Sequence, residues 1–227
     1  MPRAGEYREL STIAEVWGAG VPIDSAGRPY DPRRQSRMST SKLIASAAET
    51  VTAVVTAPQM SAVRMESPTP SADCDVHGLC HHLLNSIHIC RTAARKETWP
   101  ADRVVTMDQP PWVTFPPELL TLSQAWAAPG ATEGAVEIHG RMLPAALGAG
   151  ITLMELVVHG WELARASGQD VTYDDAVLEA ALTQVEQLAP GLRGMPDGFG
   201  PEVPVPATAG ALDRLLGLSG RDPYWKP

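Results

Sequence analysis

The residues with the clearest chemical potential are Glu155 and His159, which stand four positions apart. In a helix that spacing is slightly more than one turn, so both side chains leave the same face. A carboxylate and an imidazole that point the same way can supply two ligands to a divalent metal ion. Because Leu153, Val157 and Trp161 surround the pair, the carboxylate must be paired, protonated or metal-bound. The spacing alone favours the plainer alternative, a Glu–His hydrogen bond within a helical core.

A second stretch places four histidines on a predicted helix from about Val76 to about Lys96. Its apolar stripe consists of Leu79, Leu83, Ile87 and Cys90, and Asp73 or Asp75 is its expected N-cap. His82 lies on the flank of that stripe, so we expect it to point towards partner helices. His77, His81 and His88 recur at intervals of four and seven on another face, which predicts a solvent-facing edge.

The remaining elements are mostly helical by periodicity and by their turn residues. Helices are expected from residue 40 to 57, from 118 to 128 after Pro116-Pro117, from 144 to about 167, from 174 to 188 and from 211 to 218. Gly148 and Gly150 are expected to interrupt the fourth early, residues 135–140 alternate like an extended segment, and 99–117 reads as a loop over a cleft. These elements predict an all-α fold, an antiparallel four-helix bundle with long Pro-rich loops and extra short helices.

Composition narrows the function classes. The formal net charge of −8 argues against a nucleic-acid partner and against an anionic membrane surface, and favours a small-molecule enzyme or a protein-binding module. Three cysteines, an odd number, indicate a reducing cytoplasm rather than a disulfide framework. No apolar run is long enough to span a bilayer, and residues 1–10 do not resemble a signal peptide.

The chain divides by composition into an N-terminal extension, residues 1–38, and a helical domain, residues 39–227. The extension is rich in turn formers and charge, with a short helix expected between Tyr7 and Trp17. Leu10, Ile13 and Trp17 would share one face of that helix, which would suit pairing of two copies as a homodimer.

Two motifs resemble a known family. The stretch Asp75–Leu84 ends in His-Leu, and the stretch Glu155–Gln169 is built on His-Gly-Trp followed by an acid. Both are similar to the DinB-like metal-binding bundles of actinobacteria, the superfamily that includes mycothiol-dependent maleylpyruvate isomerase. The resemblance covers roughly residues 39 to 225.

This resemblance implies three metal ligands, His82, Glu155 and His159, and a DinB-like bundle around them. It implies a divalent metal, zinc first and nickel or iron as alternatives, with a position left open for substrate. It also implies a small thiol such as mycothiol, whose pKa the metal lowers for a transfer or isomerisation reaction. Glu162, one turn beyond His159, is expected to orient a ligand, with a surface salt bridge as the alternative.

Several alternatives stay open at this point. The doubled His81-His82 allows either residue to be the first ligand, and Trp161 is a candidate substrate contact. Arg91 could receive an anionic substrate, although a solvated surface arginine is the plainer interpretation. The thiol-dependent enzyme could belong to specialised metabolism. Alternatively, the metal could serve a lyase, cyclase or hydrolase without a thiol, or the chain could be a non-catalytic helical binding module. A Cys80–His81 nucleophile pair is disfavoured, because consecutive helical residues point about 100° apart.

Overall fold

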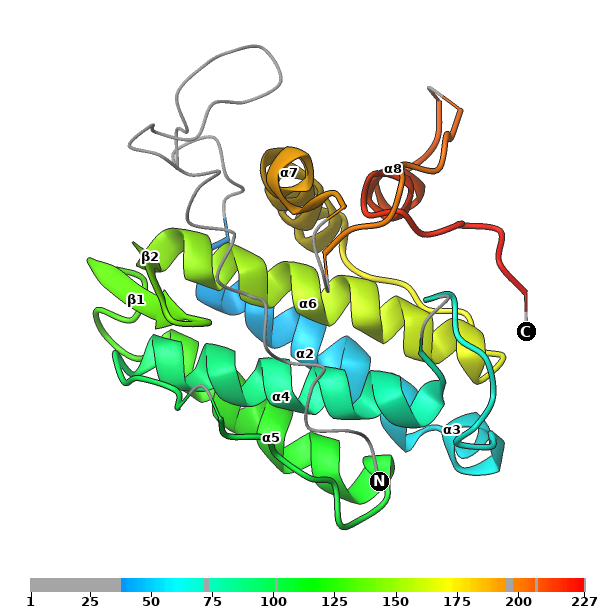
Figure 1. Cartoon of the computed structure of the whole chain (residues 1–227), viewed down its shortest axis with the longest axis horizontal. Helices are drawn as coiled ribbons and strands as arrows, with labels where there is room; N and C mark the ends of the chain where they lie inside the picture. The colour runs from blue at the N-terminus through cyan, green and yellow to red at the C-terminus, as the bar shows by residue number, and fades with distance from the viewer. Residues whose placement is uncertain (1–37, 72–73, 101, 195–197, 207, 227) are drawn as a thin grey trace.

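The computed structural model describes residues 38–71, 74–100, 102–194, 198–206 and 208–226, and helices dominate it (Figure 1). The helices are α2 (Thr40–Thr56), α3 (Pro58–Ala62), α4 (Val76–Ala94), α5 (Pro111–Ala127), α6 (Ala145–Ala166), α7 (Asp175–Leu192) and α8 (Ala211–Leu218). Strands β1 (Ala135–Ile138) and β2 (Arg141–Pro144) form a two-stranded sheet. The all-α prediction is therefore confirmed in part: the structure is mainly helical, with one small two-stranded sheet. The helix expected between Tyr7 and Trp17 lies outside the described residues.

Four helices lie side by side and enclose the main core (Figure 1). Helix α2 packs against α5 and α6, and α4 packs against the same two helices. The connection 95–110 returns along α4, so α4 and α5 run in one direction and α2 and α6 in the other (Figure 1). Each of these helices contributes fully buried apolar side chains to the core, for example Ile44, Leu83, Leu122 and Val157. Burial of these apolar stripes is the main force that holds the helices together.

Helix α4 begins where the sequence predicts. The Asp75 carboxylate accepts a hydrogen bond of 2.8 Å from the Gly78 backbone N–H, which satisfies one of the unpaired donors of the first turn. The predicted stripe is buried, from Leu79 to Cys90. The prediction for His88 was wrong: its side chain is only 12% exposed and lies against Glu118 of α5 rather than facing solvent.

Helix α6 runs without a break through Gly148 and Gly150, so the predicted early interruption was wrong. Close packing explains both glycines. A Cβ atom at position 148 would lie 2.8 Å from Val136 Cγ2, and one at position 150 would lie 1.8 Å from Gln184 Oε1. The glycines therefore let β1 and α7 approach α6 closely. Burial of the long apolar surface of α6 outweighs the low helix propensity of the two glycines.

Helix α5 begins at Pro111, well before the predicted start at Glu118. Proline suits the first helical position, because its missing N–H would be unpaired there. Pro116 and Pro117 lie inside the helix, where each forgoes a backbone hydrogen bond. Fully buried Phe115 holds this segment on the core. The predicted loop 99–117 is therefore too long, and the connection covers residues 95–110.

The expected extended segment is present as a hairpin, in which Val136 pairs with Leu143. His139 and Gly140 both have positive φ, 51° and 74°, as a tight two-residue hairpin turn requires. Val136 and Ile138 pack with Ile89, Ala93 and Ala145 in a small second cluster. The hairpin thereby covers the end of the molecule where α4 ends and α6 begins.

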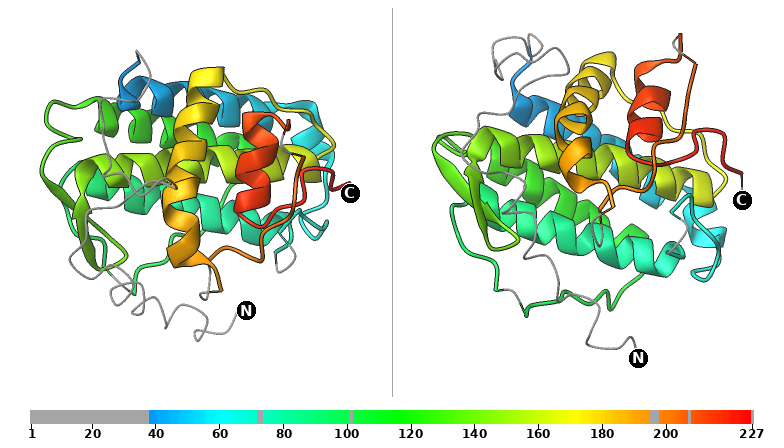
Figure 2. Two further views of the ribbon diagram at one scale, coloured as in Figure 1. Left: turned by 90° about the horizontal axis from the view of Figure 1, so that it is seen from above. Right: turned by 45° about the horizontal axis from the view of Figure 1, so that its top comes forward.

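Helices α7 and α8 lie outside the four long helices. Helix α7 packs on α6, and α8 packs on α7. Figure 2 shows α7 crossing the long helices on one face, with α8 beside it. Helix α7 ends at Leu192 rather than at the predicted Leu188, while α8 has the predicted bounds. In the described ranges, none of the helices has the length and apolarity needed to cross a bilayer.

Candidate metal centre

Helices α4 and α6 bring the three candidate ligands together. The first half of α4 supplies His82, the middle of α6 supplies Glu155, and the following turn of α6 supplies His159. Glu155 Oε2 lies 3.5 Å from His82 Nε2 and 3.2 Å from His159 Nε2. One ligand atom from each residue lies within 4.8 Å of the others. In the part of the chain that the structure describes, this is the group of His, Cys, Asp or Glu side chains gathered closely enough to hold a metal ion.

The cluster is buried on the α6 side and open on the α4 side. The side chains of His159 and Glu155 are 10% and 17% exposed, whereas that of His82 is 47% exposed. His82 thus faces the partner helix, as predicted, and also meets solvent. The buried Oε2 atom of Glu155 has no hydrogen-bond partner, although two imidazole nitrogens face it.

Glu162 fixes the orientation of the His159 ring through a contact at Nδ1. Its Oε2 atom lies 2.6 Å from His159 Nδ1, and its Oε1 atom accepts a 2.9 Å hydrogen bond from Arg221 Nε. Its side chain is fully buried, so the surface salt bridge considered from the sequence does not apply. Because Nδ1 is held by a carboxylate, Nε2 of His159 is directed at Glu155.

Neighbouring charges, more than burial, determine the pKa values of the groups in this cluster. Burial acts to raise the pKa of Glu155, but the adjacent His159 and His82 outweigh it and hold that pKa well below its usual range. Burial acts to lower the pKa of His159, but Glu162 and Glu155 raise it to about 9. Burial likewise opposes ionisation of Glu162, yet His159 and Arg221 lower its pKa to about 2. Without a metal, the cluster is therefore an imidazolium between two carboxylates.

The three residues fit a divalent metal by donor type and by spacing. Two imidazoles and one carboxylate suit zinc, nickel or ferrous iron. Two ligands each about 2.1 Å from a tetrahedral ion lie roughly 3.4 Å apart. The 3.2 and 3.5 Å separations at Glu155 Oε2 match that value, and this atom lacks any other partner. Three protein ligands leave a position open, as in catalytic rather than structural sites.

Other residues named from the sequence lie away from this cluster. His81 stacks against His77, with ring centroids 4.4 Å apart, and is not part of the three-residue group. Trp161 is buried in the main core. Arg91 bonds to Glu118 and to Thr121 Oγ1 (2.9 Å) of α5, so it is neither a solvated arginine nor part of the cluster.

The Cys80–His81 pair is not an activated nucleophile. Cys80 is fully buried, and burial together with nearby Cys74 and Asp75 raises the pKa of its thiol to about 12. A thiol in that state carries almost no thiolate at neutral pH.

Arg221 is a residue that sequence reasoning missed. It follows α8 in the chain, 59 positions after Glu162, and its Nη1 also donates to the Ser219 carbonyl oxygen (2.6 Å). The available signal was indirect: an acid in an apolar helix needs a buried cation, and the sequence does not say which one.

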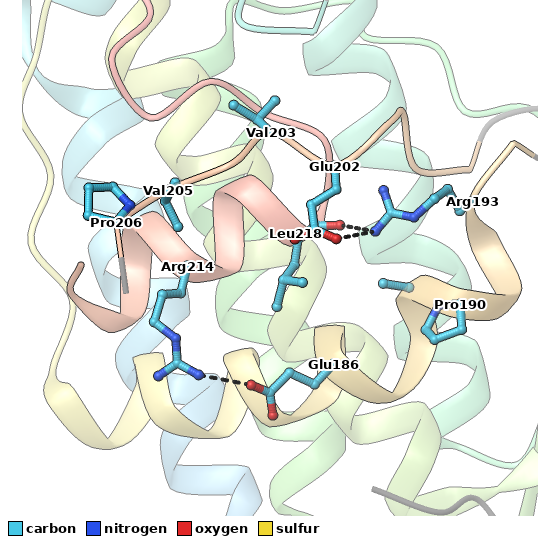
Figure 3. A pocket seen from close by; sticks show the side chains of 10 residues that line it. Glu186, Pro190, Arg193, Glu202, Val203, Val205, Pro206, Arg214 and Leu218 are labelled. Carbon is cyan, nitrogen blue, oxygen red and sulfur yellow. Dashed lines mark hydrogen bonds and ion pairs between the residues drawn. The ribbon is translucent and has the colours of Figure 1, made fainter. Parts of the chain in front are cut away.

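A cavity of about 530 Å³ lies elsewhere, between α7, α8 and residues 202–206 (Figure 3). Two ion pairs border it, Glu186 with Arg214 (3.1 Å) and Arg193 with Glu202 (3.8 Å). None of the candidate ligands lines it. Residue chemistry, rather than the size of this hollow, therefore identifies the α4–α6 cluster as the candidate site.

Comparisons with known proteins give distant relatives only. Two uncharacterized proteins of Mycobacterium tuberculosis, from strains CDC 1551 and H37Rv, are each 25% identical to this chain over 162 residues. The alignment covers 70% of this chain and 85% of each relative. No family model matches the chain, and no solved structure matches it significantly.

Proposed function

We propose that this protein is a divalent-metal-dependent cytoplasmic enzyme that activates a small thiol of the mycothiol type for transfer or isomerisation of a small-molecule substrate. In this proposal α2, α4, α5 and α6 form a DinB-like four-helix bundle, and His82, Glu155 and His159 are its metal ligands. The observation that carries the proposal is the convergence of these three side chains around Glu155 Oε2, a buried atom without a hydrogen bond.

The plainer alternative, a Glu–His ion pair in a helical core, leaves this oxygen 3.2 Å from His159 Nε2 but without a well-aligned hydrogen bond. A buried carboxylate oxygen that lacks a hydrogen bond costs about 1–3 kcal/mol. Nitrogens of His159 and His82 lie 3.2 and 3.5 Å from this oxygen, at separations that also suit shared ligation of an ion. A bound cation that displaces the His159 proton would be coordinated by this oxygen and by both imidazoles at once.

The chain's own residues divide the work. Glu162, held by Arg221, keeps His159 Nδ1 occupied, so His159 presents Nε2 to the site. His82, the most exposed ligand, lies where a substrate enters from solvent. When bound, the metal lowers the pKa of a coordinated thiol or polarises a carbonyl group.

The test is thiol binding to the cobalt-substituted protein. Full-length protein is stripped with a chelator, loaded with one equivalent of Co²⁺ and titrated with mycothiol or with N-acetylcysteine as a smaller probe. We expect a near-ultraviolet sulfur-to-cobalt absorption band that saturates with thiol. The band should be absent when N-acetylserine, which lacks the sulfur, replaces the thiol.

The matched variants are Glu155→Gln, which removes a ligand, and Glu186→Gln, which removes a half-exposed carboxylate of α7 that is far from the ligands in the chain. The band should disappear in the first variant and persist in the second. Cobalt binding that depends on Glu155 without any thiol band would refute the thiol part of the proposal and would favour a metal-dependent lyase, cyclase or hydrolase. Absence of Glu155-dependent cobalt binding would refute the metal centre itself.

A further inference from the structure

A second pair of imidazoles lies on α4, one turn before the candidate centre. His77 and His81 are four residues apart, so their side chains leave the same face of the helix. Their ring centroids are 4.4 Å apart, with the ring planes tilted by 45°. His77 is exposed and His81 is half-buried, so the pair is accessible to solvent.

This spacing is close to that of the candidate ligands. The rings of His82 and His159 have centroids 4.6 Å apart. A metal–nitrogen bond is about 2.0–2.1 Å, so two imidazoles at right angles on one ion have ring centroids roughly 4.5 Å apart. Two histidines at positions i and i+4 of a helix are also the pair that known helical zinc motifs use. The His77–His81 pair therefore needs little rearrangement to chelate an ion.

The loop over α4 helps to hold His81 in place. Asn85, one turn beyond His81, accepts a 2.9 Å hydrogen bond from the Val105 N–H and donates one of 3.1 Å to the Val105 carbonyl oxygen. Asn85 also donates a 2.9 Å hydrogen bond to the His81 carbonyl oxygen. These hydrogen bonds tie the loop to the turn of α4 that carries His81.

The pair is separate from the three-residue cluster. His81 and His82 are consecutive, so their side chains leave α4 about 100° apart. The His77 and His81 rings contact each other, whereas the His82 ring contacts His159 of α6. An ion held by the first pair would be coordinated by one helix and by water.

We propose that His77 and His81 form a second, solvent-facing site for a divalent transition-metal ion. Two imidazoles without a carboxylate select ions that prefer nitrogen ligands, Cu²⁺, Ni²⁺ and Zn²⁺, over Mg²⁺ and Ca²⁺. Coordination by only two protein ligands makes this the weaker and more rapidly exchanging site. The proposal rests on the geometry of the pair and does not depend on the function of the inner cluster.

The test is equilibrium dialysis of the chelator-stripped full-length chain, prepared without an affinity tag, against Ni²⁺. We expect two classes of bound ion in the parent protein. His77→Gln and His81→Gln should each remove the weaker class, raising its dissociation constant at least about tenfold, because a chelating partner supplies a high effective concentration. His139→Asn is the matched control, since it removes an imidazole from the hairpin at a positive-φ position that asparagine tolerates.

Each outcome decides the proposal. Loss of the weaker class in both single variants, with the control unchanged, supports a chelate. An unchanged weaker class in either variant overturns it, because a chelate needs both rings. Glu155→Gln separates the two sites: if the parent protein binds one ion that depends on His77 and His81 but not on Glu155, the surface site stands and the inner metal centre fails.

Discussion

Helix α4 contributes histidine to two clusters with carboxylates, and the two clusters differ in how the carboxylate is balanced. His82 Nε2 lies 3.5 Å from Glu155 of α6, and His88 Nε2 lies 3.2 Å from Glu118 of α5. Both pairs join α4 to a neighbouring long helix. The residue types and the distances are nearly the same, so neither property separates a structural contact from a reactive one.

The two clusters differ in whether an arginine pairs with the carboxylate. Arg91 bonds directly to the Glu118 carboxylate and donates a 2.9 Å hydrogen bond to His88 Nδ1. Since arginine only donates, His88 accepts at Nδ1 and is neutral, with its proton on Nε2 facing Glu118. Every member of this cluster has a partner. The cluster is a complete ion pair and has no vacancy for a ligand.

At the other cluster, within the described part of the chain, Glu155 forms its ion pairs with the imidazoles of His82 and His159. Glu155 Oε2 has no hydrogen bond, and the nearby Arg221 is committed to Glu162 instead. The comparison shows that a carboxylate without its own arginine, facing two imidazoles, is the feature that indicates metal binding. The arginine on Glu162 supports the site indirectly, since it anchors the acid that orients His159.

The largest expected difference between the clusters is in metal affinity. Glu155→Gln removes a ligand, so we expect the dissociation constant for Zn²⁺ to rise more than about 100-fold, beyond the loss typical of a residue behind the ligands. Glu118→Gln should leave it unchanged. Competition with a chromophoric chelator measures both. Equal losses of Zn²⁺ affinity in the two variants would contradict the proposal that only the Glu155 cluster binds metal.

A smaller effect is expected at the acid behind His159. Glu162→Gln keeps a hydrogen-bonding oxygen near Nδ1 but removes the charge, and we expect metal affinity to fall about 10–100-fold with the stoichiometry preserved. Glu186→Gln, at a half-exposed ion pair between α7 and α8, is the control. An affinity within twofold of the parent would mean that Glu162 does not act through His159.

Arg91, the arginine of the His88–Glu118 cluster, should affect the stability of the fold and leave metal binding intact. Arg91→Met deprives Glu118, Thr121 and His88 of a partner, and we expect a loss of about 1–3 kcal/mol in the free energy of unfolding. Arg214→Met, which breaks a half-exposed pair, should cost less than about 1 kcal/mol. Urea denaturation with metal titration of each variant checks both. A metal-affinity loss in Arg91→Met would contradict the separation of the two clusters.

The smallest effect concerns pH. Burial, Arg91 and Arg103 lower the pKa of His88 below its ordinary 6.5, against the opposing influence of Glu118. The unfolded chain therefore binds this proton more readily, so the stabilising contribution is complete above about pH 6.5 and declines as pH falls below it. His88→Gln should cost about 1 kcal/mol near neutral pH and flatten the decline. Urea denaturation from pH 5 to 8, with His139→Asn as control, tests this. If the free energy of unfolding of His88→Gln declines with falling pH in parallel with that of the parent, His88 is not the source of the decline.

Local patterns predicted much of the framework. Asp75 as the cap of α4, the buried stripe of that helix and the shared face of Glu155 and His159 all follow from nearest-neighbour rules of helices. The start of α5 was missed, because burial of Phe115 outweighs two internal prolines. Rules of that kind also placed His88 at the surface, where the structure pairs it with α5.

The pairing of charges was the part that local rules could not supply. Arg91 reaches Glu118 across 27 positions, and Arg221 reaches Glu162 across 59. Such contacts depend on which helices become neighbours and on where the chain after α8 lies. The three ligands could be named because a family resemblance added His82 to the Glu155–His159 pair, whereas the arginines that distinguish the clusters required the fold.

The most direct test of the metal centre is X-ray absorption spectroscopy, with elemental analysis, of the protein purified without an affinity tag. We predict one tightly held divalent ion per chain with nitrogen and oxygen neighbours at about 2.0–2.1 Å, including two imidazoles. His159→Gln should lose the ion, and Glu118→Gln should keep it. A parent protein that retains no stoichiometric metal after reconstitution, or whose bound metal is indifferent to His159, would contradict the account.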